Sequence, residues 1–224
     1  MTTTLSPTDR TQIRRHRDRA RTDRAELFEV LDASLVCHLG VMMHGSPVVI
    51  PTVFGVDPDG PDEDGTLYVH GSVAARSLVE APGQDLCVTC TVVDGLVLAR
   101  SAFHHSMNYR SAVVIGRGRV VTDRDEKVRA LDRVVDHVVP GRSATLRGHT
   151  RKELAATTVI AIALHEASVK KREGTAIDDE PDVLAGGWAG VLPIATVAGT
   201  PETAPDSMTQ QVPADVRARA RSLS

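Results

Sequence analysis

The chain has few aromatic residues and few cysteines, and each shortage excludes a class of protein. Aromatics make up 3% of the 224 residues, which argues against binding nucleic acid by stacking bases on aromatic rings. Three cysteines are an odd and small number, unlike the disulfide framework of a secreted domain. No apolar run is long enough to cross a bilayer, and the polar first residues have no apolar core of signal-peptide length. These shortages predict a cytoplasmic protein without a membrane partner.

The residues that are present form an ordinary globular composition. Hydrophobic residues make up 42% and charged residues 25%, enough to bury a core. The formal net charge is -3, so the overall field does not attract nucleic acid. Residues 1–21 are rich in arginine, but acids are interleaved, and we expect an extended arm that packs on a partner subunit. A nucleic-acid-associated regulator that uses the arginines from Arg10 to Arg24 is the less favoured alternative.

Residues 22–199 alternate between strand-like and helical patterns and form the expected main domain. The expected strands are residues 35–43, 47–56, 66–71, 85–93, 95–103, 111–121 and 157–167, with a hairpin turn at Asp94-Gly95. The expected helices begin at Asp23, span Ser72 to Glu80, run from Asp125 to about Val138, and cover Arg151 to Ala156. Strands joined by hairpins predict a mainly β fold with flanking helices, an antiparallel barrel. Residues 200–224 show no periodic pattern, and we expect a mobile tail.

Two motifs suggest metal or redox chemistry, but strand geometry argues against both. Cys87 and Cys90 are three residues apart in an expected strand, so their thiols point to opposite faces and cannot share a metal or form a disulfide. Cys37 is expected in the core as well. His104 and His105 are adjacent, and no other metal ligands accompany them at a suitable spacing. We expect no metal site, and either histidine could line a cavity or form hydrogen bonds in a turn.

Two polar segments are candidate ligand sites, since the sequence has no glycine-rich nucleotide motif. In Tyr68 to Arg76 a strand meets a glycine, and Ser72 then begins a helix whose free N–H groups could hold a phosphate, with Arg76 one turn further on. An ordinary N-cap serine with a surface arginine is the alternative. Residues 101–111 are dense in donors and acceptors between two apolar strands, which favours a site over a solvated connection.

These segments carry a family resemblance that covers roughly residues 22 to 194. The segments LVCHLG, VVIPTVF, LYVHGSVAAR, DGLVLARSAFHHSMNYRSAVVIGRGRVV, HEASVKKREG and WAGVLPI occur in this order. Together they resemble the pyridoxamine 5'-phosphate oxidase superfamily of FMN-binding split barrels, and within it the nitroimidazole-resistance-like, flavin-nucleotide-binding branch. The resemblance implies an antiparallel split β-barrel that forms a homodimer, with FMN in grooves at the subunit interface.

The resemblance also assigns roles to residues of this sequence. It implies that Pro51, Thr52 and Val53 line the edge of the flavin ring, that Ser72 and Arg76 hold the phosphate, that Asn108, Tyr109 and Ser111 flank the cofactor, and that Lys170 and Arg172 add positive charge. His70 matches a histidine that faces the substrate side of the flavin, where it could donate a proton. A structural histidine satisfied by a backbone partner is the alternative. Trp188 would pack at the pocket, at the interface or in the core.

The implied activity is FMN-dependent reduction of a small organic substrate, with a nitro-aromatic compound as one candidate. Vitamin B6 oxidation is not expected, because the tail from Ala214 to Arg219 does not match the arginine-rich substrate segment of that oxidase. Two alternatives stay open. One is a flavin- or haem-binding protein for storage, sensing or haem degradation, and the other is a reductase that uses the deazaflavin F420.

Overall fold

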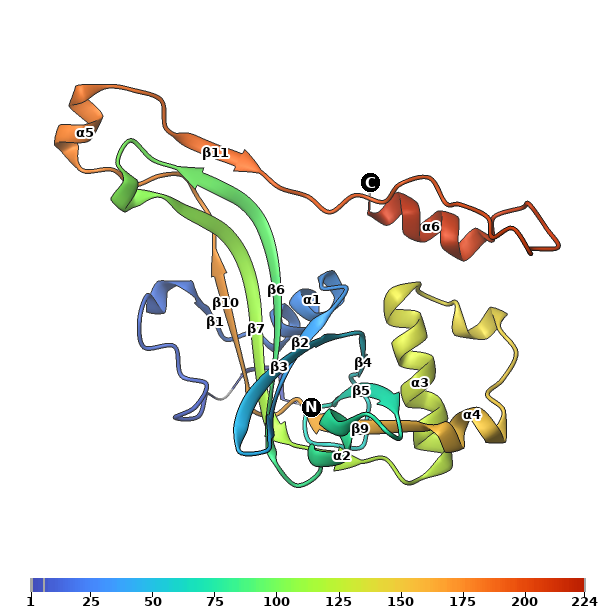
Figure 1. The fold of residues 1–224 in the computed structure, drawn as a ribbon. Coiled ribbons are helices and arrows are strands. Elements are labelled where there is room, and N and C mark those ends of the chain that lie inside the picture. The colour runs from blue at the N-terminus through green and yellow to red at the C-terminus, as the bar shows by residue number, and fades with distance from the viewer. Residues whose placement is uncertain (1, 6, 224) are drawn as a thin grey trace.

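The computed structural model describes residues 2–5 and 7–223, and across them the strands form two antiparallel sheets (Figure 1). The larger, seven-stranded sheet has the order β1-β10-β7-β6-β2-β3, with β11 added to β6. Its strands are β1 (Ala20–Arg21), β10 (Ala167–Arg172), β7 (Ser106–Arg117), β6 (Asp85–Leu98), β2 (Cys37–Met43), β3 (Ser46–Thr52) and β11 (Gly190–Pro193). The four-stranded sheet has the order β4-β5-β9-β8 and consists of β4 (Phe54–Asp57), β5 (Thr66–Ser72), β9 (Thr157–Ala163) and β8 (Arg119–Val120). The expected antiparallel split-barrel architecture is therefore confirmed.

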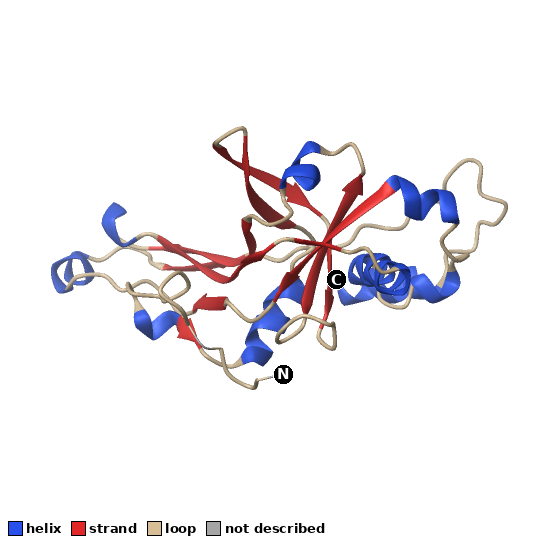
Figure 2. Cartoon of the chain, turned by 90° about the horizontal axis from the view of Figure 1, so that it is seen from below, coloured by secondary structure: helices blue, strands red, loops and turns tan. Residues whose placement is uncertain are grey.

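Helices lie on the outside of the two sheets, whose strands run through the middle of the molecule in Figure 2. The helices are α1 (Arg24–Ala33), α2 (Arg76–Glu80), α3 (Arg124–Val138), α4 (Arg151–Ala156), α5 (Glu180–Ala185) and α6 (Ala214–Ser222), with single 3-10 turns η1 (Arg17–Arg19), η2 (Ala102–His104) and η3 (Ser143–Thr145). None of the helices in the described part of the chain is long and apolar enough to cross a bilayer.

Helix α3 forms where its capping residue and its apolar stripe predict. The Asp123 carboxylate accepts a hydrogen bond from the N–H of Glu126 at 2.7 Å, which satisfies one of the free donors of the first turn. Ala130 and Leu131 are buried in a small core that also contains Tyr68 of β5. The predicted amphipathic helix is confirmed, and it covers one face of the four-stranded sheet.

The expected hairpin at Asp94-Gly95 is wrong, because β6 runs on through it as a single strand from Asp85 to Leu98. The register with β7 shifts between Val93 and Gly95, which makes Asp94 a bulge. A Cβ atom at Gly95 would lie 2.9 Å from Val191 Cγ1 and 3.1 Å from the carbonyl oxygen of Leu192, so the glycine permits a close approach of β11. The bulge thus allows β6 and β7 to continue together beyond the body of the molecule.

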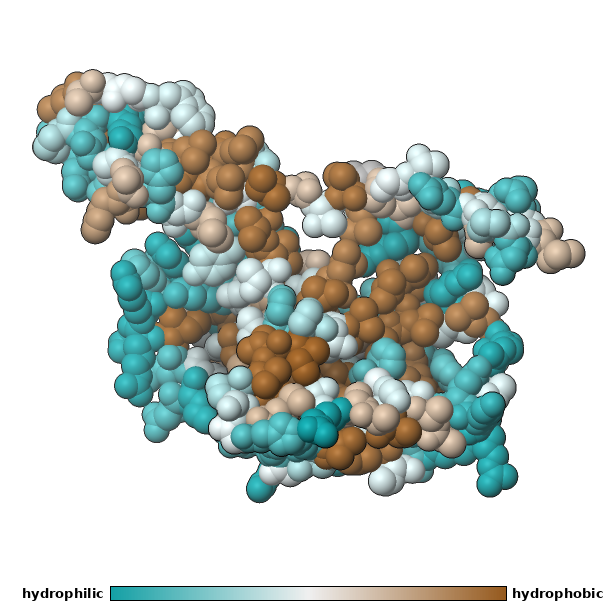
Figure 3. Space-filling model, viewed as in Figure 1, coloured by the Kyte–Doolittle hydropathy of each residue, from teal (hydrophilic) through white to brown (hydrophobic). Residues whose placement is uncertain are grey.

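Beyond the bulge, β6, β7 and β11 form a projection that ends near α5 at the top of Figure 1. Apolar side chains are exposed along it, as Figure 3 shows. Phe103 is 88% exposed and Trp188 is 69% exposed, so Trp188 does not pack in the core. Apolar side chains exposed in this way are available for contact with another molecule.

Both chain ends contact the body of the same chain. Leu5 and Thr11 are buried, and Arg10 forms ion pairs with Asp85 at 2.8 Å and with Glu166. These contacts lie within one chain, and the packing of residues 1–21 on a partner subunit stays a prediction. In the tail, where no regular element was expected, Ala214–Ser222 form α6, and Asp215 pairs with Arg142 at 3.2 Å.

The core lies on one face of the seven-stranded sheet. Cys37, Leu39 and Val41 of β2 alternate with less buried residues, as expected for a strand with one face covered. Cys90 is buried and Cys87 is half-buried, in agreement with the prediction that they point to opposite faces. Burial raises the pKa of the Cys37 and Cys90 thiols to about 12, so both are inert core residues at neutral pH.

Candidate functional site

The predicted site residues fall into two groups that lie on different elements. The corner group lies where the chain passes between the two sheets, and the strand group lies on β7 and β10. The corner group is Pro51, Thr52, Val53, His70, Ser72 and Arg76, and the strand group is Asn108, Tyr109, Ser111 and Lys170.

The corner group is organised by the passage from β3 to β4. Because β3 ends at Thr52 and β4 begins at Phe54, Val53 is the residue at which the chain leaves one sheet and enters the other. Phe54 pairs with Val69 of β5, and continuing this register by one residue places Val53 beside His70. The structure therefore brings the predicted ring-edge segment and the predicted histidine together.

His70 is a half-buried imidazole with an unsatisfied nitrogen. Its Nδ1 is buried and has no hydrogen-bond partner in the described part of the chain, so the backbone partner of the alternative interpretation is not found for this atom. Burial lowers the pKa of His70 below its ordinary value, which keeps the imidazole neutral at neutral pH. A buried polar atom without a partner is costly, so Nδ1 of His70 is open to a hydrogen bond from a water molecule or a ligand. Neutral imidazole can donate or accept a hydrogen bond or bind a metal.

The predicted helix start at Ser72 is wrong. Strand β5 continues through Ser72, which pairs with Thr157 of β9, and α2 begins only at Arg76. The Ser72 hydroxyl accepts a hydrogen bond from the N–H of Ala74 at 3.2 Å. Pairing with β9 outweighs the local capping tendency of the serine, so a phosphate could not use an N-cap at this position.

Arg76 remains a cation that could bind an anion. It is exposed, and its guanidinium Nη1 contacts Nε2 of His44. In the described part of the chain no carboxylate lies within ion-pair distance of Arg76. The nearby Glu80 carboxylate instead lies 3.9 Å from Nε2 of His44. A free guanidinium at this position fits the predicted phosphate contact without the helix start.

Tyr109, Ser111 and Lys170 of the strand group lie on the face of the seven-stranded sheet that points away from the core. Residues opposite one another in paired strands point to the same face, as do residues two apart in one strand. The registers therefore assign the following residues to this outer face: Val49 and Pro51 on β3, His38 on β2, Thr89, Thr91 and Val93 on β6, Tyr109, Ser111 and Val113 on β7, and Ser168, Lys170 and Arg172 on β10. Pro51 of the corner group thus shares this face with Tyr109, Ser111 and Lys170.

His38 is a residue of this outer face that the sequence interpretation did not select. It pairs with Pro51 on one side and Thr89 on the other, and its side chain is exposed. The signal was present in the alternation of LVCHLG, in which Cys37 points inward and His38 outward. A histidine on an otherwise aliphatic and hydroxyl-bearing face adds a possible metal ligand or proton carrier.

Two residues of the strand group, Asn108 and Ser111, form hydrogen bonds. Ser111 pairs with Lys170 across the strands, and its hydroxyl donates to the Lys170 carbonyl oxygen at 3.4 Å. Asn108 donates to the carbonyl oxygen of Gly174 at 3.0 Å and accepts a hydrogen bond from Arg172. Lys170 has no carboxylate partner in the described part of the chain, so its charge is available to a ligand.

The two adjacent histidines have separate protein neighbours. His105 Nδ1 lies 2.8 Å from the carbonyl oxygen of Ser101, the turn contact that was one of the two alternatives. His104 Nε2 lies 3.3 Å from a carboxylate oxygen of Asp179. Both residues sit at the end of the projection, so they belong to neither the corner group nor the strand group.

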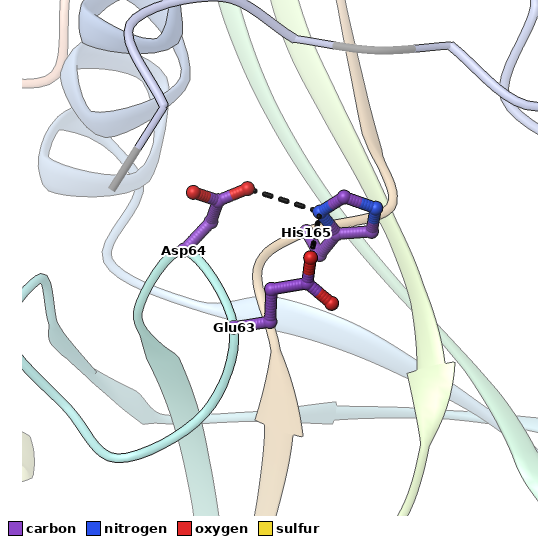
Figure 4. Close-up of side chains that lie close together, drawn as sticks. All are labelled: Glu63, Asp64 and His165. Carbon is purple, nitrogen blue, oxygen red and sulfur yellow. Dashed lines mark hydrogen bonds and ion pairs between the residues drawn. The ribbon is translucent and has the colours of Figure 1, made fainter.

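One cluster has the composition of a metal site but is saturated by protein groups. Glu63, Asp64 and His165 bring their ligand atoms within 4.8 Å of one another, with both carboxylates near Nδ1 of His165 (Figure 4). The buried Asp64 carboxylate also pairs with Arg24 at 3.0 Å and accepts a hydrogen bond from the N–H of Thr2 at 2.7 Å. A cation would have to compete with the Arg24 guanidinium, so this cluster serves to hold the N-terminal segment on the barrel.

Comparison with known proteins identifies the class of fold. The family model for pyridoxamine 5'-phosphate oxidase matches residues 23–171. The chain therefore belongs to the pyridoxamine 5'-phosphate oxidase-like family of split-barrel flavin-binding proteins. Among curated proteins nothing matches it.

Solved structures extend the likeness beyond the family model. The flavocytochrome Anf3 from Azotobacter vinelandii is 37% identical, with a TM-score of 0.86 over 96% of this chain and 98% of that chain. An FAD- and haem-binding protein from Mycobacterium smegmatis is 39% identical, with a TM-score of 0.82 over 90% of this chain and 97% of that chain. A candidate 5-nitroimidazole antibiotic resistance protein from Bacteroides thetaiotaomicron is 21% identical, with a TM-score of 0.54 over 67% of this chain and 85% of that chain, which is a likeness of fold alone.

Proposed function

We propose that this protein binds a flavin for electron or hydride transfer and also binds haem. The observation that carries the proposal is the likeness, over 90% or more of the chain, to a flavocytochrome and to an FAD- and haem-binding protein. FMN is the flavin that the sequence resemblance implies, and FAD is the flavin named for the Mycobacterium smegmatis protein. The two share the isoalloxazine ring and the first phosphate, so the corner group suits either.

The chemistry of the two residue groups fits a flavin. Arg76 and Lys170 are cations without carboxylate partners in the described part of the chain, as a phosphate-binding role requires. Residues 51–53 offer backbone groups at the junction of the two sheets, and Tyr109 adds an aromatic ring on the outer face. When bound, the flavin supplies the redox chemistry, and these residues bind and orient it.

A homodimer is part of the proposal, because the outer face of the seven-stranded sheet is largely uncovered. Val49 is 65% exposed and Val93 is 36% exposed on this face. A second copy packed on it would bury these side chains and could bring the corner group of one subunit toward the strand group of the other. We expect sedimentation equilibrium to give twice the mass of the chain, and a monomer at micromolar concentration would contradict the shared site.

Haem binding draws support from two histidines. His70 is neutral and has a free buried nitrogen, and His38 is exposed on the outer face. Neutral imidazole is the form that binds iron. His70 is also the residue proposed to donate a proton to a bound substrate, and the two roles differ in spectroscopy. Replacing an iron ligand changes the Soret band, whereas replacing a proton donor leaves it unchanged.

The first experiment is an absorption spectrum of the purified protein, followed by titration of the apoprotein with FMN, FAD, F420 and haem. We expect flavin bands and a Soret band, with one flavin per subunit at saturation. Tight binding of FMN or FAD without haem binding would support the flavin part of the proposal and refute the haem part. Preference for F420 would retain the fold and replace the cofactor, and binding of none of the four would contradict the proposal.

The substrate of a flavin oxidoreductase would be a small organic molecule, and a nitro-aromatic compound is the class to test first. Reduction that depends on a nicotinamide donor would distinguish an enzyme from a protein that stores or senses its cofactor. We also propose a cytoplasmic location, since its three cysteines are free thiols. Cell fractionation tests this location directly.

A further inference from the structure

A cavity of about 430 Å³ lies between the η1–β1 segment and the end of β10, away from the corner group. Its volume falls in the range of small-molecule sites, roughly 300–1,000 Å³. The charged side chains that line it are Asp18, Arg19, Arg21, Lys171, Arg172 and Glu173. Cations therefore outnumber acids around this pocket, which we call the basic pocket.

Arg172 is the buried cation of the basic pocket. It is 7% exposed, and its guanidinium donates to Asn108 Oδ1 and to the carbonyl oxygens of Gly174 at 3.3 Å and Thr175 at 3.2 Å. All of these acceptors are neutral, and no carboxylate in the described part of the chain lies within ion-pair distance. Burial and the nearby Arg19 charge lower the pKa of Arg172 below the ordinary arginine value. A buried charge without a counter-charge is unfavourable unless a ligand supplies one.

The second free cation of the basic pocket is Arg19. The other two are neutralised by acids, because Arg21 pairs with Glu26 at 3.4 Å and Lys171 pairs with Glu173 at 2.8 Å. Arg19 has no carboxylate partner in the described part of the chain, and it lies close enough to Arg172 to disfavour its charge. The remaining acid of the lining, Asp18, is exposed. Two guanidinium groups from different elements thus face one pocket, and neither is paired with a carboxylate in the described part of the chain.

We propose that the basic pocket binds the phosphate or diphosphate group of a small molecule. Two free guanidinium groups need about two negative charges, which a phosphate monoester or a diphosphate diester carries near neutral pH. The planar forks of Arg19 and Arg172 can each donate paired hydrogen bonds to phosphate oxygens. The diphosphate of FAD is one source of this group, and only that source depends on the proposed flavin function. A separate phosphorylated molecule is the other.

The test uses inorganic pyrophosphate as the probe, titrated by calorimetry into the full-length protein after any bound flavin has been removed. We expect saturable binding that Arg19→Gln weakens at least tenfold, about the contribution of one charge-assisted pair. Arg15→Gln is the matched control, because Arg15 is an exposed arginine of the same segment that does not line the pocket. Arg172→Lys, which keeps the charge and removes the fork, should also weaken binding. Absence of pyrophosphate binding, or equal affinities for Arg19→Gln and Arg15→Gln, would overturn the proposal.

Competition identifies the source of the phosphate. The pocket holds the diphosphate of FAD if FAD displaces pyrophosphate and FMN does not. In that case Arg19→Gln should weaken the binding of FAD and leave the binding of FMN unchanged. If pyrophosphate binds while FAD is in place, the pocket holds a separate phosphorylated molecule. Pyrophosphate binding by a protein that binds no flavin would leave this site standing and refute the proposed function. Flavin binding without pyrophosphate binding would refute this site and leave the proposed function standing.

Discussion

Removing the Arg24 guanidinium should destabilise the protein more than removing any exposed arginine. Arg24 is 2% exposed, pairs with Asp64 at 3.0 Å, and donates to the carbonyl oxygen of Leu164 at 2.9 Å. Arg24→Met keeps most of the side-chain volume but leaves the buried Asp64 carboxylate without its cation. Breaking a buried pair in this way costs about 3–5 kcal/mol. For a chain of this size the loss corresponds to a decrease in Tm of roughly 6–20 °C.

Urea unfolding of the cofactor-free protein measures this loss, with m-values compared to confirm that the same transition is followed. Arg14→Met is the matched control, because Arg14 is exposed and its nearest acid, Asp9, is 3.9 Å away, and its effect should stay within about 0.5 kcal/mol. Adding Asp64→Asn to Arg24→Met should recover part of the loss, since the unpaired charge is then removed. A destabilisation by Arg24→Met below about 1 kcal/mol would show that the Arg24–Asp64 pair is not buried or that another group takes the place of Arg24.

The same pair predicts how stability depends on pH. Burial raises the pKa of the Asp64 carboxyl, but hydrogen bonds from Thr2 and His165 and the Arg24 charge together lower it to about 2. Because this pKa is lower in the folded protein than in the unfolded chain, the stabilisation is complete above about pH 4 and is lost as the pH falls toward 2. Unfolding curves between pH 5 and 2 should show this loss in the wild type and a smaller one in Arg24→Met. An equal pH dependence of the free energy of unfolding in the two proteins would contradict this role of the Arg24–Asp64 pair.

Three further predictions concern the site and the core. Arg76→Ala should weaken flavin binding by about 1.5–3 kcal/mol if the guanidinium contacts the phosphate, whereas Arg117→Ala, another exposed arginine, should leave the affinity unchanged in the same fluorescence titration. His70→Ala should retain flavin and lose turnover or the Soret band, and a variant with full activity and an unchanged spectrum would make His70 structural. Cys90→Ser should lower the free energy of unfolding by about 1–3 kcal/mol without loss of cofactor, while Cys87→Ser, at a half-buried position, should change it less.

The sequence did not separate β3 from β4 or predict β10, but it predicted the class of fold, because alternation and family motifs report burial along each strand. Cys87 and Cys90 illustrate this, since a period of two placed them on opposite faces without any knowledge of the partner strands. The resemblance also brought together Ser111 and Lys170, which the structure pairs directly across β7 and β10. Their role toward a cofactor stays a prediction.

The errors arose where distant strands override local preferences. Asp94-Gly95 has strong turn chemistry, but β7 and β11 pair on either side of β6 there, and the Asp94 carboxylate is held by Arg110 at 2.8 Å. Ser72 has good capping chemistry, but β9 pairs with it and extends β5. The resemblance implied a positive charge at Arg172, but its burial without a carboxylate partner depends on which acids the fold leaves far away.

The paired residues Pro51, His38 and Thr89 restrict where residues can be inserted or deleted in this chain. Because side chains alternate with a period of two, inserting one residue into β2 would exchange Cys37 and His38, driving an imidazole into the core and a thiol onto the outer face. A one-residue deletion would do the same. Insertions and deletions in related sequences should therefore collect in connections such as residues 139–150, while β2 keeps a constant length.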